Sequence, residues 1–105
     1  MDYRSKIEKA VENGLKSEPE FLENKNLTFV RDRKYNMSQE NTDVEVYIED
    51  IDEDTYVIYI YGIEYVSGMC CAIRNFLRKA SVEEVFVRRR LTENHKCIEI
   101  TVDFV

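Results

Sequence analysis

The single histidine of this 105-residue sequence, His95, stands two positions before Cys97. Side chains two positions apart on a β-strand point to the same face, so this pair could supply half of a metal site. The other cysteines, Cys70 and Cys71, are adjacent and therefore lack the C-x-x-C spacing of a structural zinc site. Two chance residues near a hairpin turn are the simpler interpretation. We expect no bound metal and no cofactor.

Other signatures of enzyme chemistry are missing from the sequence. It has no glycine-rich phosphate loop, no GxSxG elbow and no HExxH. Asp50, Asp52 and Asp54 have the alternate spacing of a calcium loop, but Tyr61 stands where the bidentate glutamate should be. We interpret these acids as a solvated turn. We expect no catalytic residues and predict that the protein is not an enzyme.

Tyrosines are concentrated between residues 47 and 65, where five of the seven occur. Aromatic side chains gathered in this way can line an apolar ligand pocket or a dimer interface, and they can equally form an ordinary core. Three of them, with two apolar residues further along the chain, form our candidate ligand-binding set: Tyr59, Tyr61, Tyr65, Met69 and Phe76.

Charge is unevenly distributed along the chain, which carries a net −6. Residues 35–73 contain nine acids and no lysine or arginine, whereas residues 74–90 contain six bases and two acids. Arg88, Arg89 and Arg90 alternate across a predicted strand, so Arg88 and Arg90 share a face and form our candidate partner-binding pair. Two solvated faces of opposite charge would also explain the pattern. The functional alternative is an acidic partner or a self-complementary dimer.

These residues must be positioned by elements that the hydrophobic periodicity predicts. Strand 56–63 is apolar on both faces, so it should be central in a sheet, or a partner should cover its second face. Gly68 and Ala72 are small residues one helical turn apart, which would permit close helix packing. The predicted elements are helix 2–16, a short helix after Ser17, strands 27–35, 43–49 and 56–63, helix 64–80, and hairpin arms 82–92 and 96–105.

The order of these elements predicts a single α+β domain spanning residues 1–105. It should contain an antiparallel sheet of four to five strands, with one long helix and a short N-terminal helical segment on one face. Composition agrees with a globular domain, because 44% of residues are apolar and 34% are charged.

Composition also excludes several classes of function. The sequence pI of about 4.8 argues against nucleic-acid binding, which needs a basic surface. No uncharged run approaches the roughly 20 residues of a membrane span, and the N-terminal residues have no apolar signal region. An odd number of cysteines without a clear pairing fits a reducing compartment. We expect a cytoplasmic protein.

The C-terminal half resembles the superfamily that joins 4-vinyl reductase domains with the α/β subunits of the TRAPP tethering complex. The resemblance lies in a helix followed by a hairpin that ends Ile98–Phe104, and Cys97 matches the hairpin cysteine of the 4-vinyl reductase domains. In the helix, Asn75 replaces a glycine of the family pattern, and an earlier hairpin cysteine is absent. The matching helix residues are Tyr65, Cys70, Ile73, Arg74 and Leu77.

This resemblance implies either a small-molecule or hydrocarbon-binding domain or a subunit of a tethering assembly. The family has more helices before its sheet than this chain can hold, so a complete pocket would need a second copy. We therefore expect a homodimeric module that binds an apolar small molecule or a protein partner between helix 64–80 and the tyrosine-rich strands. The alternative is a protein-docking subunit that works through Arg88 and Arg90.

Overall fold

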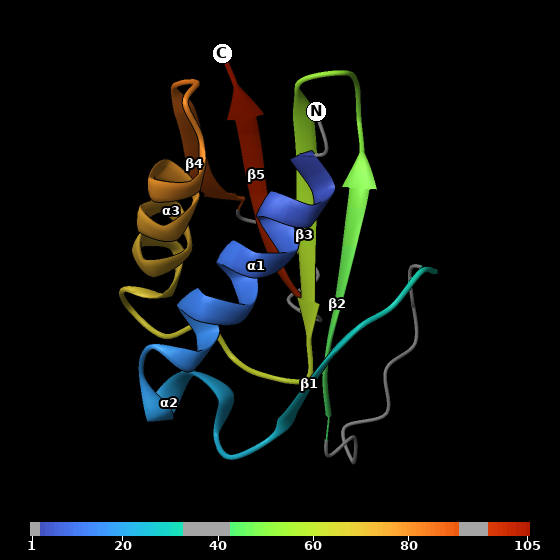
Figure 1. Cartoon of the computed structure of the whole chain (residues 1–105). Helices are drawn as coiled ribbons and strands as arrows, with labels where there is room; N and C mark the ends of the chain where they lie inside the picture. Colours follow the sequence, from blue (N-terminus) through green and yellow to red (C-terminus); the bar gives the residue numbers. More distant parts are fainter. Residues whose placement is uncertain (1–2, 33–42, 91–96) are drawn as a thin grey trace.

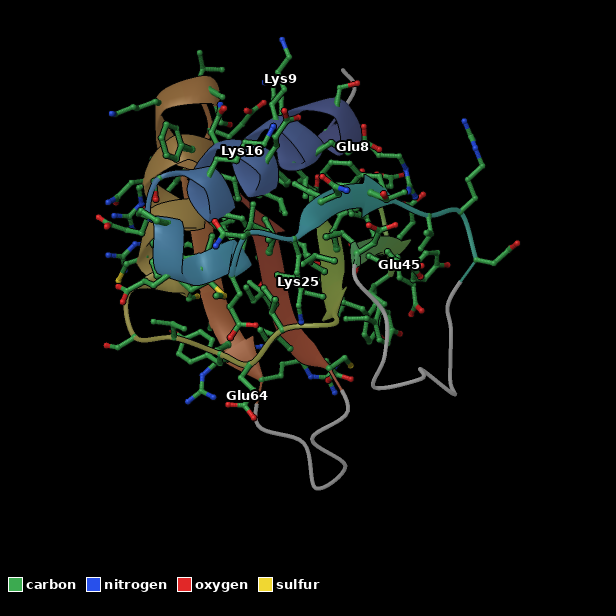
Figure 2. The ribbon with its side chains drawn as sticks, turned by 90° about the horizontal axis from the view of Figure 1, so that it is seen from below. Glu8, Lys9, Lys16, Lys25, Glu45 and Glu64 are labelled. Atoms are coloured by element: carbon green, nitrogen blue, oxygen red, sulfur yellow. The ribbon has the colours of Figure 1, made fainter. Side chains whose placement is uncertain are left out.

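The computed structural model describes residues 3–32, 43–90 and 97–105. Five strands form one sheet in the order β1-β2-β3-β5-β4, and two helices lie side by side over one face of it (Figures 1 and 2). The elements are α1 (Tyr3–Lys16), α2 (Pro19–Leu22), β1 (Asn26–Phe29), β2 (Asp43–Asp50), β3 (Thr55–Tyr61), α3 (Met69–Ala80), β4 (Val85–Arg90) and β5 (Ile98–Phe104).

The predicted α+β arrangement is confirmed, with one difference in the sheet. The pairs β2–β3, β3–β5 and β5–β4 are antiparallel, whereas β1 runs parallel to β2. The sheet is therefore mixed. The alternation of residues 27–35 could not reveal this, because parallel and antiparallel strands share the same period of two.

Strand β3 is central, as its two apolar faces predicted, because it pairs with β2 on one side and β5 on the other. Ile58 and Ile60 belong to the main core beneath the helices, and neither is exposed to solvent. Val57, Tyr59 and Tyr61 form a separate buried cluster on the opposite face. The period of two along the strand thus divides its apolar residues between two layers.

Helix α1 packs its predicted apolar stripe against α3 and the sheet, burying Ile7, Val11 and Leu15. The two helices are in close contact at Gly14, where a Cβ would lie 2.8 Å from Ile73 Cγ1. The small residue that permits close packing is therefore in α1. A Cβ on Gly68, by contrast, would meet only Phe21, at 3.9 Å.

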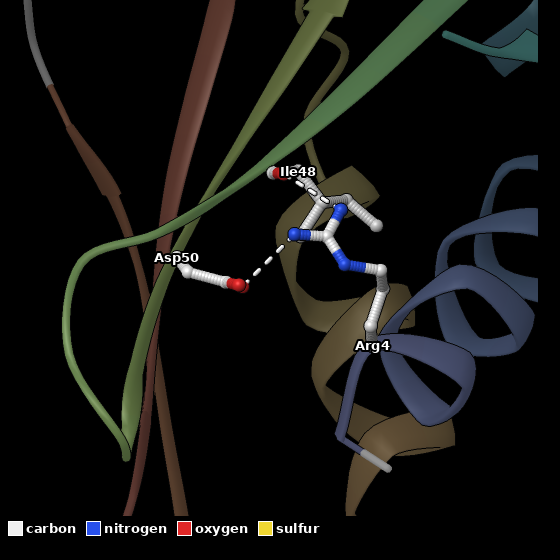
Figure 3. A network of polar contacts seen from close by, with 3 residues as sticks. All are labelled: Arg4, Ile48 and Asp50. Carbon is white, nitrogen blue, oxygen red and sulfur yellow. Dashed lines mark hydrogen bonds and ion pairs between the residues drawn. The ribbon is translucent and has the colours of Figure 1, made fainter. Parts of the chain in front are cut away.

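The first turn of α1 is also joined to the sheet by polar contacts (Figure 3). Arg4 Nη1 donates a 2.9 Å hydrogen bond to the carbonyl of Ile48, and its Nη2 contacts Asp50 Oδ1 at 2.9 Å. Both charged side chains are substantially exposed, so the ion pair adds little to stability. The contact orients α1 across the end of β2.

Helix α3 begins at Met69, so the predicted start at residue 64 is wrong. Gly68, at the N-cap, has a φ of 94°, a left-handed conformation that cannot continue a right-handed helix backwards. The helix ends at Ala80 as predicted. Its last turn carries Arg78 and Lys79, which suit the negative end of the helix dipole.

The remaining elements were predicted in the right order with somewhat different bounds. The hairpin arms 82–92 and 96–105 shorten to β4 and β5, and the strand predicted for 27–35 is observed as β1. Residues 33–42 and the hairpin turn with His95 lie outside the described residues. Gly62, with a φ of 97°, ends β3 where a Cβ would meet the carbonyl oxygen of Asp43 at 2.7 Å.

Candidate functional site

The five candidate ligand-binding residues do not come together in one place. Met69 is fully buried in the main core, and Tyr65 and Phe76 are partly buried against that same core. Tyr59 and Tyr61 lie in the cluster on the opposite face of the sheet. The structure therefore corrects the expected apolar surface between residues 64–80 and the tyrosine-rich strands, because the sheet itself separates the two groups.

The tyrosine cluster is packed within the chain. Tyr59 and Tyr61 are 4% and 3% exposed, and Tyr47 stacks on Tyr59 with ring centroids 6.0 Å apart. Offset stacking of this kind is a normal way to bury aromatic rings. The packing favours the ordinary-core interpretation of these tyrosines over a ligand pocket.

The arginines, in contrast, are gathered at one edge of the sheet. Strand β4 is the last strand in the order, and it pairs with β5. Arg88 and Arg90 share one face, as predicted, and Arg90 Nε lies 3.8 Å from Glu99 Oε2. Arg89 is on the helix side, where its guanidinium carbon lies 4.2 Å from the ring centroid of Tyr65. Arginines thus flank both sides of this edge strand.

A groove with a volume of about 610 Å³ runs between this edge and helix α3. Arg74 and Arg78 line it from the helix, while Phe86, Val87 and Arg88 line it from β4. Sequence reasoning missed Arg74, Arg78 and Phe86 as site residues. One signal was available, because residues four apart on a helix lie on the same face. Nothing in the sequence placed that face beside β4.

The groove is strongly basic. Within the described parts of the chain, none of the lining arginines Arg74, Arg78 and Arg88 forms an ion pair with a carboxylate. Arg74 Nη2 instead donates to Cys71 Sγ at 3.6 Å, and its buried Nε has no hydrogen-bond partner. These guanidinium groups keep donors that a ligand can use, and each can engage a carboxylate through two parallel bonds.

One acidic residue also lines the groove, and its carboxylate accepts a hydrogen bond from within the chain. Asp103, on β5, accepts a 2.8 Å hydrogen bond from the hydroxyl of Thr55. Its carboxylate adds one negative charge to the lining of the groove. Because the whole chain is acidic, with a net charge of −6, this basic edge differs in sign from the protein as a whole.

Cys70 and Cys71 of α3 are free, and the surroundings of Cys70 do not activate it. Burial raises the pKa of the Cys70 thiol, and the neighbouring Cys71 raises it further, whereas Arg74 and Arg89 oppose the shift. A raised pKa keeps a thiol protonated and weakly nucleophilic. The described residues contain no group of three or more His, Cys, Asp or Glu side chains that could hold a metal ion.

Two further sequence candidates can be placed. Cys97 is half-buried beside the tyrosine cluster, but His95 lies outside the described residues, so the proposed pair stays a prediction. Asp52 accepts hydrogen bonds from the backbone N–H groups of Asp54 and Thr55, both at 2.9 Å. This is a side-chain-capped turn, which gives Asp52 a structural role between β2 and β3.

No helix in the described part of the chain combines the length and apolar character that crossing a membrane requires. The comparisons with family models, curated proteins and solved structures give no match to this chain. The functional conclusion therefore depends on the geometry and charge of the groove.

Proposed function

We propose that this domain is a protein-docking module that holds an acidic partner in the groove between α3 and β4. One observation carries the proposal: three arginines from two separate elements line one groove, and no described carboxylate forms an ion pair with any of them. The sequence offered a docking alternative through Arg88 and Arg90. In the groove, Arg74 and Arg78 join Arg88 as the contacting residues, and Arg90 is not among the lining residues.

The character of the groove favours a protein partner. Phe86 and Val105, which also line it, are 50% and 71% exposed, so apolar and cationic surface lie together. Protein interfaces are enriched in arginine and aromatic residues of this kind. The overall charge of −6 would repel a polyanion such as DNA or RNA, whereas a short acidic segment meets only the basic edge.

Charge reversal in the groove tests the proposal. The probe is a fluorescent twelve-residue peptide rich in glutamate, and a lysine-rich peptide of equal length is its counterpart. We expect the glutamate peptide alone to bind, with an affinity that falls as salt is raised from 50 to 200 mM. The double variant Arg74→Glu/Arg78→Glu should weaken binding at least tenfold, equivalent to about 1.4 kcal/mol.

A matched variant separates local contacts from overall charge. Lys9→Glu/Arg31→Glu makes the same change in net charge at two exposed positions outside the groove, and Lys9 points away from the sheet (Figure 2). This variant should bind the glutamate peptide within about twofold of the parent protein. Equal weakening by both double variants would contradict a docking site in the groove.

A further inference from the structure

The outer edge of β4 presents backbone groups in a definite pattern. Val105 donates a 2.9 Å backbone hydrogen bond to the carbonyl of Glu84, which fixes the phase of the β4–β5 ladder. In an antiparallel ladder, bonded pairs alternate along the strand. Phe86, Arg88 and Arg90 therefore direct their N–H and C=O groups towards β5. The groups of Val87 and Arg89, which are not buried, point outward, and no described strand pairs with that side.

Helix α3 carries charges beside this edge at a spacing that suits a strand. Arg74 and Arg78 are four residues apart, which corresponds to a rise of about 6 Å along the helix. Alternate residues of a β-strand repeat at about 6.6 Å. Helix α3 runs alongside β4 (Figure 1), so an extended chain in the groove would present every second side chain to one of these arginines.

We infer that the partner binds by adding an extended strand to the outer edge of β4. Its backbone pairs with Val87 and Arg89, and acidic side chains at alternate positions meet Arg74 and Arg78. Strand addition of this kind gains affinity from main-chain hydrogen bonds and specificity from alternate side chains. The inference depends on the proposed docking function and specifies its partner as an acidic, extended segment of another protein.

A second copy of this chain fits the edge less well. The opposite edge of the sheet, β1, is four residues long and carries no acid. A second β4 would bring another set of arginines to the same edge, and like charges brought together oppose pairing. Charged edge strands are a common means of preventing such self-association. Charge complementarity therefore favours a foreign acidic strand.

A peptide with alternating residues tests strand addition directly. The probe is a nine-residue peptide in which glutamate alternates with threonine, compared with two N-methylated forms. One form is methylated at the glutamates and the other at the threonines, so each removes one set of backbone donors and leaves the charge unchanged. Only one set faces β4 in a strand. We expect one form to lose at least tenfold in affinity and the other to bind like the parent peptide.

Amide hydrogen exchange of the protein supplies the second measurement. In the free protein, Phe86 and Arg88 should already be protected by β5, whereas the amides of Val87 and Arg89 should exchange rapidly. Saturating peptide should slow exchange of these two amides at least tenfold. Because exchange is measured at individual amides of the unsubstituted protein, the result does not depend on the folding of any variant.

The outcomes separate this inference from the proposed function. Peptide binding that neither N-methylated form weakens, with Val87 unprotected, would overturn strand addition and leave docking by charge intact. Absence of peptide binding would overturn both. Protection of Val87 without peptide, together with a dimer in sedimentation, would show that a second copy occupies the edge and would overturn the foreign segment.

Discussion

Replacement of Gly14 by alanine should destabilise the protein, although alanine is the better helix former. In an exposed helix the change would stabilise by about 0.8–1.0 kcal/mol. Here the new Cβ would lie 2.8 Å from Ile73 Cγ1 and 3.0 Å from both the Cα and the backbone nitrogen of Ile73. Ordinary contacts between carbon atoms are about 3.5–4.0 Å, so α1 and α3 must move apart.

The size of the effect is the cost of overpacking the core minus the gain in helix propensity. Overpacking of a well-packed core costs about 1–3 kcal/mol. Two of the three close atoms belong to the backbone of α3 and cannot rotate away, which places the cost in the upper part of that range. Subtracting the gain in helix propensity leaves a net loss of about 1–2 kcal/mol in the free energy of unfolding.

Urea unfolding followed by circular dichroism measures this difference, and Asn13→Ala is the matched control. Asn13 is the exposed neighbour of Gly14 in α1, so its replacement should stabilise by up to about 0.7 kcal/mol. The two variants should therefore move the unfolding midpoint in opposite directions. A Gly14→Ala protein as stable as the parent, or more stable, would refute the close helix contact.

Other substitutions test the core, a turn and a surface carboxylate. Ile58→Ala removes a fully buried side chain and should cost about 2–5 kcal/mol in urea unfolding. Asp52→Ala removes the acceptor of two backbone N–H groups and should lower the free energy of unfolding by about 1 kcal/mol. Asp52→Asn keeps an acceptor oxygen, so it should retain most of that stability. Hydrogen bonding from Ser81 lowers the pKa of Glu83, so Ser81→Ala should raise that pKa in an NMR titration. Because the pKa is depressed, the stabilisation from Glu83 is present above its unfolded pKa and should disappear as pH falls through the folded value.

Much of the fold follows from local patterns in the sequence. Ile7, Val11 and Leu15 recur at helical spacing, and the structure buries all three in the core. The start of α3 was misplaced because Tyr65 and Val66 fit the same periodicity, yet they pack against the core from a segment before the helix. Periodicity records which side chains are buried. It does not report the backbone φ angle at a glycine such as Gly68, the N-cap residue directly before the helix.

The candidate site was predictable only in part. The alternation in β3 places Tyr59 and Tyr61 on the face opposite Ile58, but both sets are apolar, so the sequence does not show which set faces the helices. The arginine pair of β4 was visible as a strand pattern. Its proximity to Arg74 depends on the strand order and on how α3 packs, which are long-range properties of the fold.

The position of β5 between β3 and β4 has a consequence for how this domain is made. A ribosome releases the strands in sequence order, so β5 emerges after every other strand of the sheet. Until then β4 has no strand to pair with among the described elements, because it pairs with β5. Helix α1, synthesised first, must likewise wait for α3, which lies more than 50 residues later. Folding that depends on such distant contacts is slow to nucleate, and nascent chains that end before residue 98 should be the targets of chaperones and proteases.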